Sequence, residues 1–89
     1  MSPGAFLRAA REASGLTTLD VALRTETTPP VSASARARLV GAIEDDLVIP
    51  CQGDLLALQE VYHFEWRDFE AATGSTVATI AKPILRRAA

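Results

Sequence analysis

The 89-residue sequence lacks several features that mark particular classes of protein. It has one cysteine, Cys51, so no disulfide can form within the chain, and a single thiol fits a reducing compartment. No stretch approaches the roughly 18 consecutive apolar residues that span a bilayer, and the N-terminus has no basic region followed by an apolar run, as a signal peptide would. We therefore expect one small cytoplasmic domain with no membrane segment.

The sequence also lacks the common motifs of catalysis and metal binding. It has no Gly-rich phosphate loop, no paired-cysteine spacing and no pattern of a catalytic triad, and no motif surrounds Cys51 or the lone His63. The consecutive carboxylates of Glu44, Asp45 and Asp46 would point in different directions from a helix, which favours a solvated surface over a metal site. We expect no enzyme activity and no cofactor.

The net charge of −2 is unevenly distributed along the chain. Residues 1–38 carry five arginines and three acids, residues 39–81 carry eight acids and one arginine, and the last eight residues carry three basic side chains. A polyanion is therefore expected to meet the N-terminal half and the basic tail, while the acidic middle faces elsewhere.

Apolar residues recur at helical spacing in five segments of the chain. The expected helices run from Pro3, capped by Ser2, to Gly15; from about Thr18 to Thr25; from a cap at Ser32 or Ser34 to the region of Leu47; from Cys51 to Tyr62; and from Glu65 to Ala72. The expected inward-facing residues are Phe6, Leu7, Ala10, Ala13, Leu19, Ala22, Leu23, Leu39, Val40, Ile43, Leu47, Leu55, Leu58, Val61, Tyr62, Trp66 and Phe69. Thr17 and Asp20 have the spacing of a capping box, Cys51 fits a small buried position, and His63 fits the end of a helix.

Beyond Gly74 the pattern changes. The segment Thr76-Val77-Ala78-Thr79-Ile80 favours a β-strand, and Lys82-Pro83-Ile84-Leu85-Arg86-Arg87 is basic and apolar. We expect a helical domain over residues 1–74 and a C-terminal arm over residues 75–89. The arm could form a dimerising strand, pack against the domain or be disordered.

Two segments have a characteristic residue spacing. The first joins Phe6-Leu7-Arg8, Gly15-Leu16-Thr17 and Val21-Ala22. The second joins Ile43-Glu44, Pro50, Leu55-Leu56-Ala57-Leu58, Tyr62-His63-Phe64 and Trp66-Arg67-Asp68-Phe69. Together they resemble the lambda-repressor-like helix-turn-helix family of the Cro and xenobiotic-response-element type, over about residues 5 to 72. The resemblance implies an all-α, compact five-helix domain.

The resemblance further implies a sequence-specific transcriptional regulator of the phage or mobile-element type. Such a protein binds a double-stranded DNA operator as a homodimer and places its third helix in the major groove. Thr17 and Thr18 match positions that contact the DNA backbone, and Arg36 and Arg38 fall on the exposed N-terminal half of the third helix. The expected DNA-binding residues are Thr17, Thr18, Ser32, Ser34, Arg36, Arg38, Lys82, Arg86 and Arg87.

Two departures from the family pattern favour an alternative. The connection around Pro29 and Pro30 is about eight residues longer than the family's tight turn. Asp45 and Asp46 follow Glu44 where the family has a basic or small residue, and they would repel a nearby phosphate. The alternative is a helix-turn-helix scaffold used as a protein-binding module, such as an antirepressor or an inhibitor of a host protein.

Overall fold

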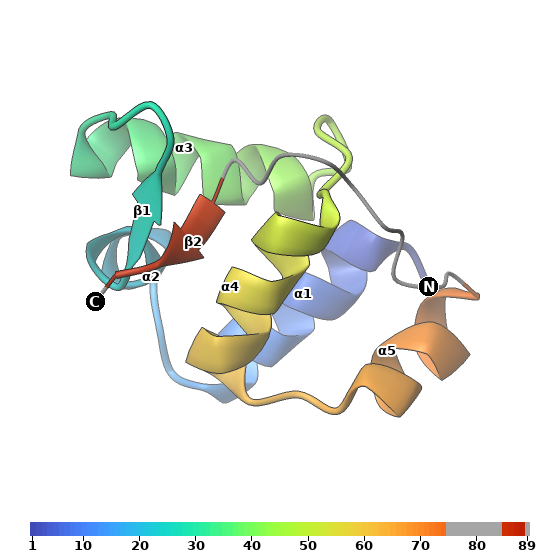
Figure 1. Cartoon of the computed structure of the whole chain (residues 1–89). Helices are drawn as coiled ribbons and strands as arrows, with labels where there is room; N and C mark the ends of the chain where they lie inside the picture. The colour runs from blue at the N-terminus through green and yellow to red at the C-terminus, as the bar shows by residue number, and fades with distance from the viewer. Residues whose placement is uncertain (75–84, 89) are drawn as a thin grey trace.

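The computed structural model describes residues 1–74 and 85–88, which form five α-helices and two short β-strands (Figure 1). The elements are α1 (Pro3–Ala13), α2 (Thr18–Leu23), β1 (Thr25–Thr27), α3 (Ala33–Glu44), α4 (Gln52–Tyr62), α5 (Trp66–Thr73) and β2 (Leu85–Arg87). The expectation of a mainly helical small domain is confirmed. The strand predicted over Thr76–Ile80, and Lys82, lie outside the described residues. Within the described part of the chain, no helix is long and apolar enough to cross a membrane.

Local sequence signals determine where the helices begin and end. The hydroxyl oxygens of Ser2, Thr17 and Ser32 each accept a hydrogen bond from a main-chain N–H in the first turn of α1, α2 and α3. At the other end, His63 and Gly74 adopt left-handed backbone conformations, with φ of 62° and 68°, and terminate α4 and α5. The capping roles expected for Ser2, Thr17 and His63 are therefore confirmed.

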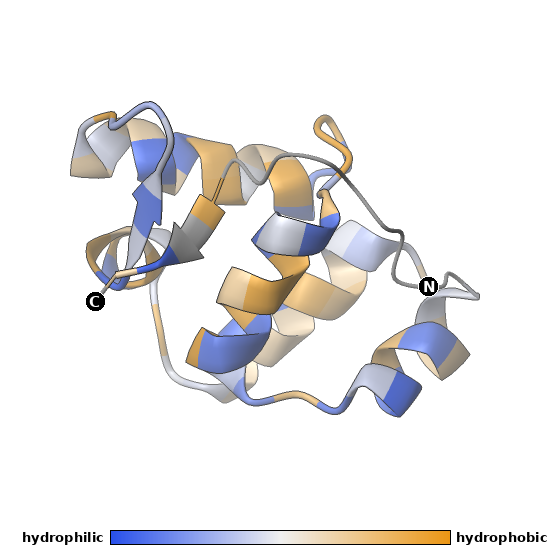
Figure 2. Cartoon of the chain, in the orientation of Figure 1, coloured by the Kyte–Doolittle hydropathy of each residue, from blue (hydrophilic) through white to orange (hydrophobic). Residues whose placement is uncertain are grey.

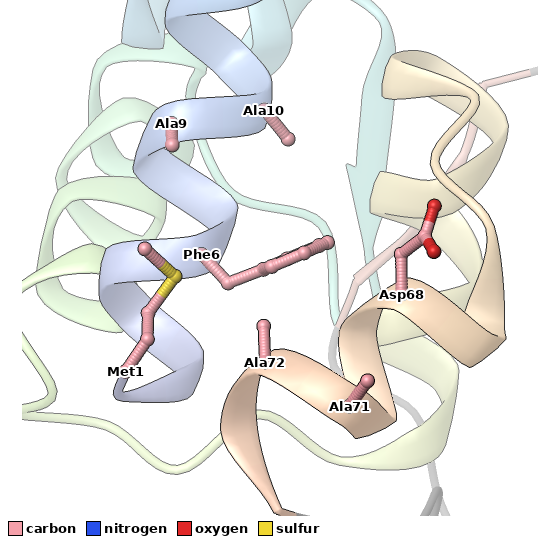
Figure 3. A pocket seen from close by; sticks show the side chains of 7 residues that line it. All are labelled: Met1, Phe6, Ala9, Ala10, Asp68, Ala71 and Ala72. Carbon is pink, nitrogen blue, oxygen red and sulfur yellow. The ribbon is translucent and has the colours of Figure 1, made fainter.

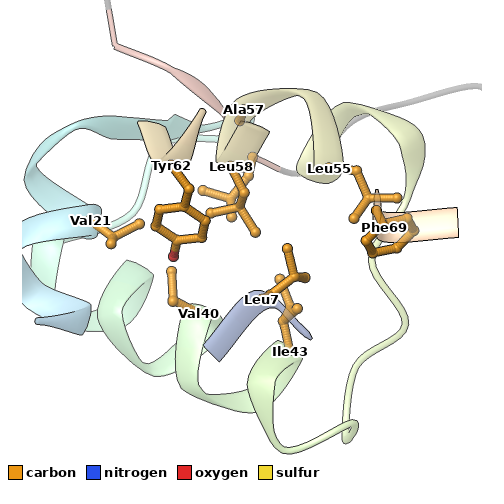
Figure 4. Packing of buried hydrophobic residues seen from close by; sticks show 10 residues of the cluster. Leu7, Val21, Val40, Ile43, Leu55, Ala57, Leu58, Tyr62 and Phe69 are labelled. Atoms are coloured by element: carbon orange, nitrogen blue, oxygen red, sulfur yellow. The ribbon is translucent and has the colours of Figure 1, made fainter. Parts of the chain in front are cut away.

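Buried apolar side chains from all five helices and from β2 form one core (Figure 4). Its members are Leu7, Val21, Val40, Ile43, Leu55, Ala57, Leu58, Tyr62, Phe69 and Leu85. Edge-to-face ring contacts join Phe6 to both Phe64 and Phe69, each with a centroid distance of 5.3 Å, and Trp66 to Phe64 at 5.2 Å. Trp66 is half-buried and packs against this core, on the inward side that the sequence predicts.

Four residues that were expected to face inward are exposed: Ala13, Leu19, Leu23 and Leu47. Helix α2 is shorter than predicted and ends at Leu23, because the next residues leave the helix to form β1. It turns Val21 toward the core in place of Leu19 and Leu23, while Ala22 is buried as predicted. Leu47 is exposed because α3 ends at Glu44, and the left-handed backbone of Asp46 (φ 58°) then turns the chain away from the core.

The long connection between α2 and α3 pairs with the end of the chain. Strand β1 runs antiparallel to β2, with Thr25 opposite Arg87 and Thr27 opposite Leu85. Leu85 is fully buried, and its N–H donates to Oδ1 of the buried Asp54 at 2.6 Å. The last described residues of the C-terminal arm therefore pack against their own domain.

Candidate nucleic-acid interface

The C-terminal end of α3 is joined to α1 by a buried ion pair. Arg11 Nε donates to Glu44 Oε2 at 2.7 Å and its Nη2 donates to Oε1 at 3.0 Å, while Arg8 Nε reaches the same Oε1 at 3.3 Å. Only 2% of the Glu44 side chain is exposed. The hydrogen bonds to Glu44 raise the pKa of Arg11. The prediction that Glu44 is solvated is therefore wrong. The sequence pattern does not show its partners, because they lie more than 30 residues upstream.

The next two carboxylates also have partners on α1. Asp45 forms an ion pair with Arg8, and Asp46 Oδ1 accepts a hydrogen bond from Gly4 N at 2.9 Å. A Cβ added at Gly4 would lie 2.4 Å from the Glu44 carbonyl oxygen, so the close approach of α1 to the end of α3 requires glycine. The positive N-terminus of α1 thus meets the negative C-terminus of α3. Asp45 and Asp46, which were expected to repel DNA, thus each have a partner on α1, a guanidinium for Asp45 and a main-chain N–H for Asp46, and both remain exposed.

At its other end, α3 is attached to α2 by Arg36. The guanidinium donates through Nε to the Ala22 carbonyl oxygen at 2.9 Å and through Nη1 to the Val31 carbonyl oxygen at 2.5 Å. Arg36 is half-buried, so the expectation of a freely exposed side chain is wrong. Through these two hydrogen bonds Arg36 holds the start of α3 against the end of α2.

Between these attachments α3 presents an outer stripe, which we define as Ser34, Arg38 and Gly41. The spacing places the three residues on one face of the helix. Arg38 is exposed, and its side chain makes no hydrogen bond or ion pair with any described residue. A Cβ at Gly41 would meet no atom within 4 Å. Ser34 is exposed, and its hydroxyl lies 3.3 Å from that of Ser32.

The start of α2 is occupied by its own capping box. Thr17 N donates to Asp20 Oδ2 at 2.9 Å, and Asp20 N donates to Thr17 Oγ1 at 3.1 Å. These bonds, the main-chain bond above all, lower the pKa of Asp20. The main-chain donor of Thr17, expected to serve a phosphate, is therefore already used, and Thr18 is half-buried.

Two further arginines lie beside the start of α3. Arg24 and Arg87 line an open hollow of about 430 Å³ together with Glu60 and His63. A second hollow of about 470 Å³, which Arg36 lines, shares Leu23 and Ala88 with the first. The structure thus brings Arg24, Arg36 and Arg87 to one end of the molecule. Arg24 was not among the predicted site residues, because the strand that places Arg87 near it lies some 60 residues later in the chain.

The side of the molecule formed by α5 has a different character. Glu65, Asp68 and Glu70 are exposed there, with Arg67 as the basic residue of the helix. The hollow of about 640 Å³ between α1 and α5 is lined by apolar side chains and Asp68, with no basic side chain (Figure 3). This side suits a polyanion poorly.

Comparison of the chain with protein-family models, curated proteins and solved structures finds no match.

Proposed function

We propose that this chain is a DNA-binding regulator of transcription, which contacts a double-stranded operator as a homodimer through the outer stripe of α3. One observation carries the proposal. The carboxylates at the end of α3 are bound by Arg8, Arg11 and Gly4 of α1. The exposed Arg38 is left without a carboxylate partner among the described residues.

The outer stripe has the chemistry and the shape for contact with base edges. An exposed arginine on a helix in the major groove can donate two hydrogen bonds to O6 and N7 of a guanine. Gly41 has no side chain, so the helix can approach the bases closely at that point. The hydroxyls of Ser32 and Ser34 can donate to phosphates, which fixes the protein on the duplex without selecting a sequence.

The arginines beside α3 extend this surface along the DNA backbone. Arg24 and Arg87 are exposed at the end of α2 and on β2, where each can neutralise a phosphate and release a counterion. Arg36 has a different role, because its hydrogen bonds to two main-chain carbonyl oxygens orient α3. We therefore assign sequence selection to Arg38 and orientation of the helix to Arg36.

The proposal is tested by selecting duplexes from a random-sequence pool and titrating the enriched duplex with purified variants. Arg38→Ala should weaken binding by about 1–3 kcal/mol, which is roughly 5- to 150-fold. Gly41→Glu should weaken binding as well, because it adds a carboxylate to the stripe at a position with open space. Arg67→Ala, on α5, is the matched control and should bind like the wild type. No enriched sequence, or equal binding by all variants, would contradict the proposal.

The alternative, a protein-binding module, is favoured by one observation. Leu19 and Leu23 lie four residues apart on α2 and are 49% and 63% exposed, so that they form an apolar surface of the kind that protein partners cover. The two functions separate in the same selection experiment. A protein-binding module would enrich no duplex sequence, and its weak binding to DNA at low salt would not depend on Arg38.

A further inference from the structure

The hollow of about 430 Å³ lies where the C-terminal ends of α2, α4 and β2 come together. Its charged and polar side chains are Arg24, Glu60, His63 and Arg87, and all four residues are exposed. Figure 2 shows blue, hydrophilic ribbon near the C-terminal end of α4 and at the end of β2. Polar groups that converge on a hollow from different elements are typical of a binding site for a small molecule.

The two arginines that line this hollow have no ion-pair partner among the described residues. Arg24 Nη1 donates to the Asp20 carbonyl oxygen at 3.1 Å, whereas the Asp20 carboxylate accepts from Thr17 N. Ala88 N donates to the Arg24 carbonyl oxygen at 3.1 Å, so the end of β2, which carries Arg87, lies beside the end of α2. Two guanidinium groups at one hollow, neither of them paired with a carboxylate, favour an anionic ligand.

Glu60 indicates which kind of anion suits the hollow. A DNA backbone carries a row of phosphates, and the Glu60 carboxylate would repel the phosphate nearest to it. A small molecule with one phosphate group brings no further anion, and its hydroxyl or amino group can donate a hydrogen bond to Glu60. A phosphate monoester carries a charge of about −1.5 to −2 at pH 7, which two guanidinium groups balance. The lining therefore suits a small phosphorylated molecule better than a polyanion.

We propose that the hollow of Arg24, Glu60, His63 and Arg87, here called the anion hollow, binds a small phosphate monoester that also carries a hydroxyl or amino group. Arg24 and Arg87 donate to the phosphate oxygens, and the imidazole of His63 offers a further donor. Glu60 accepts a hydrogen bond from the hydroxyl or amino group. Because the hollow is open and its charged groups are exposed, the dissociation constant should lie in the micromolar to millimolar range.

The bound ligand would compete with DNA. In the proposed function Arg24 and Arg87 each neutralise a phosphate of the DNA backbone, and a phosphate monoester in the anion hollow would occupy the same two guanidinium groups. By thermodynamic linkage, the ligand should weaken DNA binding by the same factor by which DNA weakens ligand binding. This competition rests on the proposed function, whereas binding of the phosphate monoester does not.

The test is an NMR titration of the ¹⁵N-labelled full chain with glycerol 3-phosphate, without DNA and at an ionic strength kept constant with sodium chloride. The amide signals of Arg24, His63 and Ala88 should shift and reach saturation. Arg24→Ala and Arg87→Ala should each weaken binding by about 5- to 10-fold. Arg67→Ala, on α5, is the matched control and should bind like the wild type. No saturable shift up to about 20 mM, or equal binding by all variants, would overturn the inference.

A second titration, with inorganic phosphate, examines Glu60. The wild type should bind glycerol 3-phosphate more tightly than inorganic phosphate, because only the former carries hydroxyl groups that can donate to Glu60. Glu60→Ala removes both this acceptor and the repulsion of the anion, so it should reduce or abolish the preference. A preference for inorganic phosphate in the wild type, or one that Glu60→Ala leaves unchanged, would contradict the assigned role of Glu60.

The competition is measured with the duplex enriched in the selection experiment. Glycerol 3-phosphate should weaken DNA binding by the wild type more than sodium chloride of equal ionic strength does, and this difference should disappear in Arg87→Ala. Equal effects of the two salts on the wild type would contradict the competition. A protein that binds glycerol 3-phosphate but no DNA would contradict only the proposed function. A protein that binds DNA but shows no saturable shift with glycerol 3-phosphate would contradict only the anion hollow.

Discussion

Replacement of Arg11 by methionine should destabilise the domain more than any surface substitution. Methionine keeps the length of the side chain but removes both bonds to Glu44 and the bond from Nη1 to the Leu16 carbonyl oxygen. Glu44, with 2% of its side chain exposed, would then keep only Arg8 as a partner, at 3.3 Å. Removing one member of a buried pair costs about 3–5 kcal/mol, because the remaining charge stays in a poorly solvated place.

This cost is a large share of the free energy of unfolding expected for a small domain, about 5–15 kcal/mol. Glu44→Gln should cost less, about 1–2 kcal/mol, because the amide oxygen can still accept a hydrogen bond from Arg11, and the Arg11 side chain is more exposed than that of Glu44, at 15% against 2%. The double variant Arg11→Met/Glu44→Leu removes both charges. It should be more stable than Arg11→Met alone.

Urea unfolding followed by circular dichroism measures these differences, provided that the dependence of the free energy on urea is the same for all variants. The reasoning would be refuted if Arg11→Met cost less than about 1 kcal/mol, or if the double variant were less stable than Arg11→Met. Either result would mean that the ion pair between Arg11 and Glu44 contributes little to holding α3 against α1.

One substitution and one truncation test how the end of α3 and the end of the chain are attached to the domain. Gly4→Ala should destabilise the domain by about 1–3 kcal/mol, although alanine normally favours a helix, because its Cβ would lie 2.4 Å from the Glu44 carbonyl oxygen; an increase in melting temperature would contradict this. Truncation after Gly74 should cost about 3–5 kcal/mol, since it removes the fully buried Leu85 and leaves the buried Asp54 without that N–H donor. A truncated chain that unfolds at the wild-type urea concentration would show that the arm contributes nothing to the core.

The sequence predicted the features that depend on neighbouring residues. The hydroxyl caps at Ser2 and Thr17 and the helix end at His63 follow from contacts within a few residues, and the structure has each of them. The apolar periodicity likewise placed Leu7 and Phe69 in the core, because helical spacing brings such residues to one face.

The features that were missed depend on residues far apart in the chain. The burial of Glu44 could not be predicted, because an acid at the end of a helix is normally solvated and its partner Arg11 is 33 residues away. Strands β1 and β2 have three residues each, too few for an alternating pattern to be recognised. Arg36 was expected to face DNA because the sequence pattern predicts its position on the helix. The pattern does not predict that carbonyl groups of α2 and of the connection between α2 and α3 lie beside its guanidinium.

The central claim, that DNA meets the outer stripe of α3, is tested most directly by amide chemical shifts. The ¹⁵N-labelled protein would be titrated at low salt with a mixed-sequence duplex of about 20 base pairs, long enough for two half-sites. We predict that the amide signals of Ser34, Arg38 and Gly41 shift, while those of Arg67 and Glu70 on α5 stay in place. Shifts confined to α5, or an unchanged spectrum at saturating duplex, would contradict the claim.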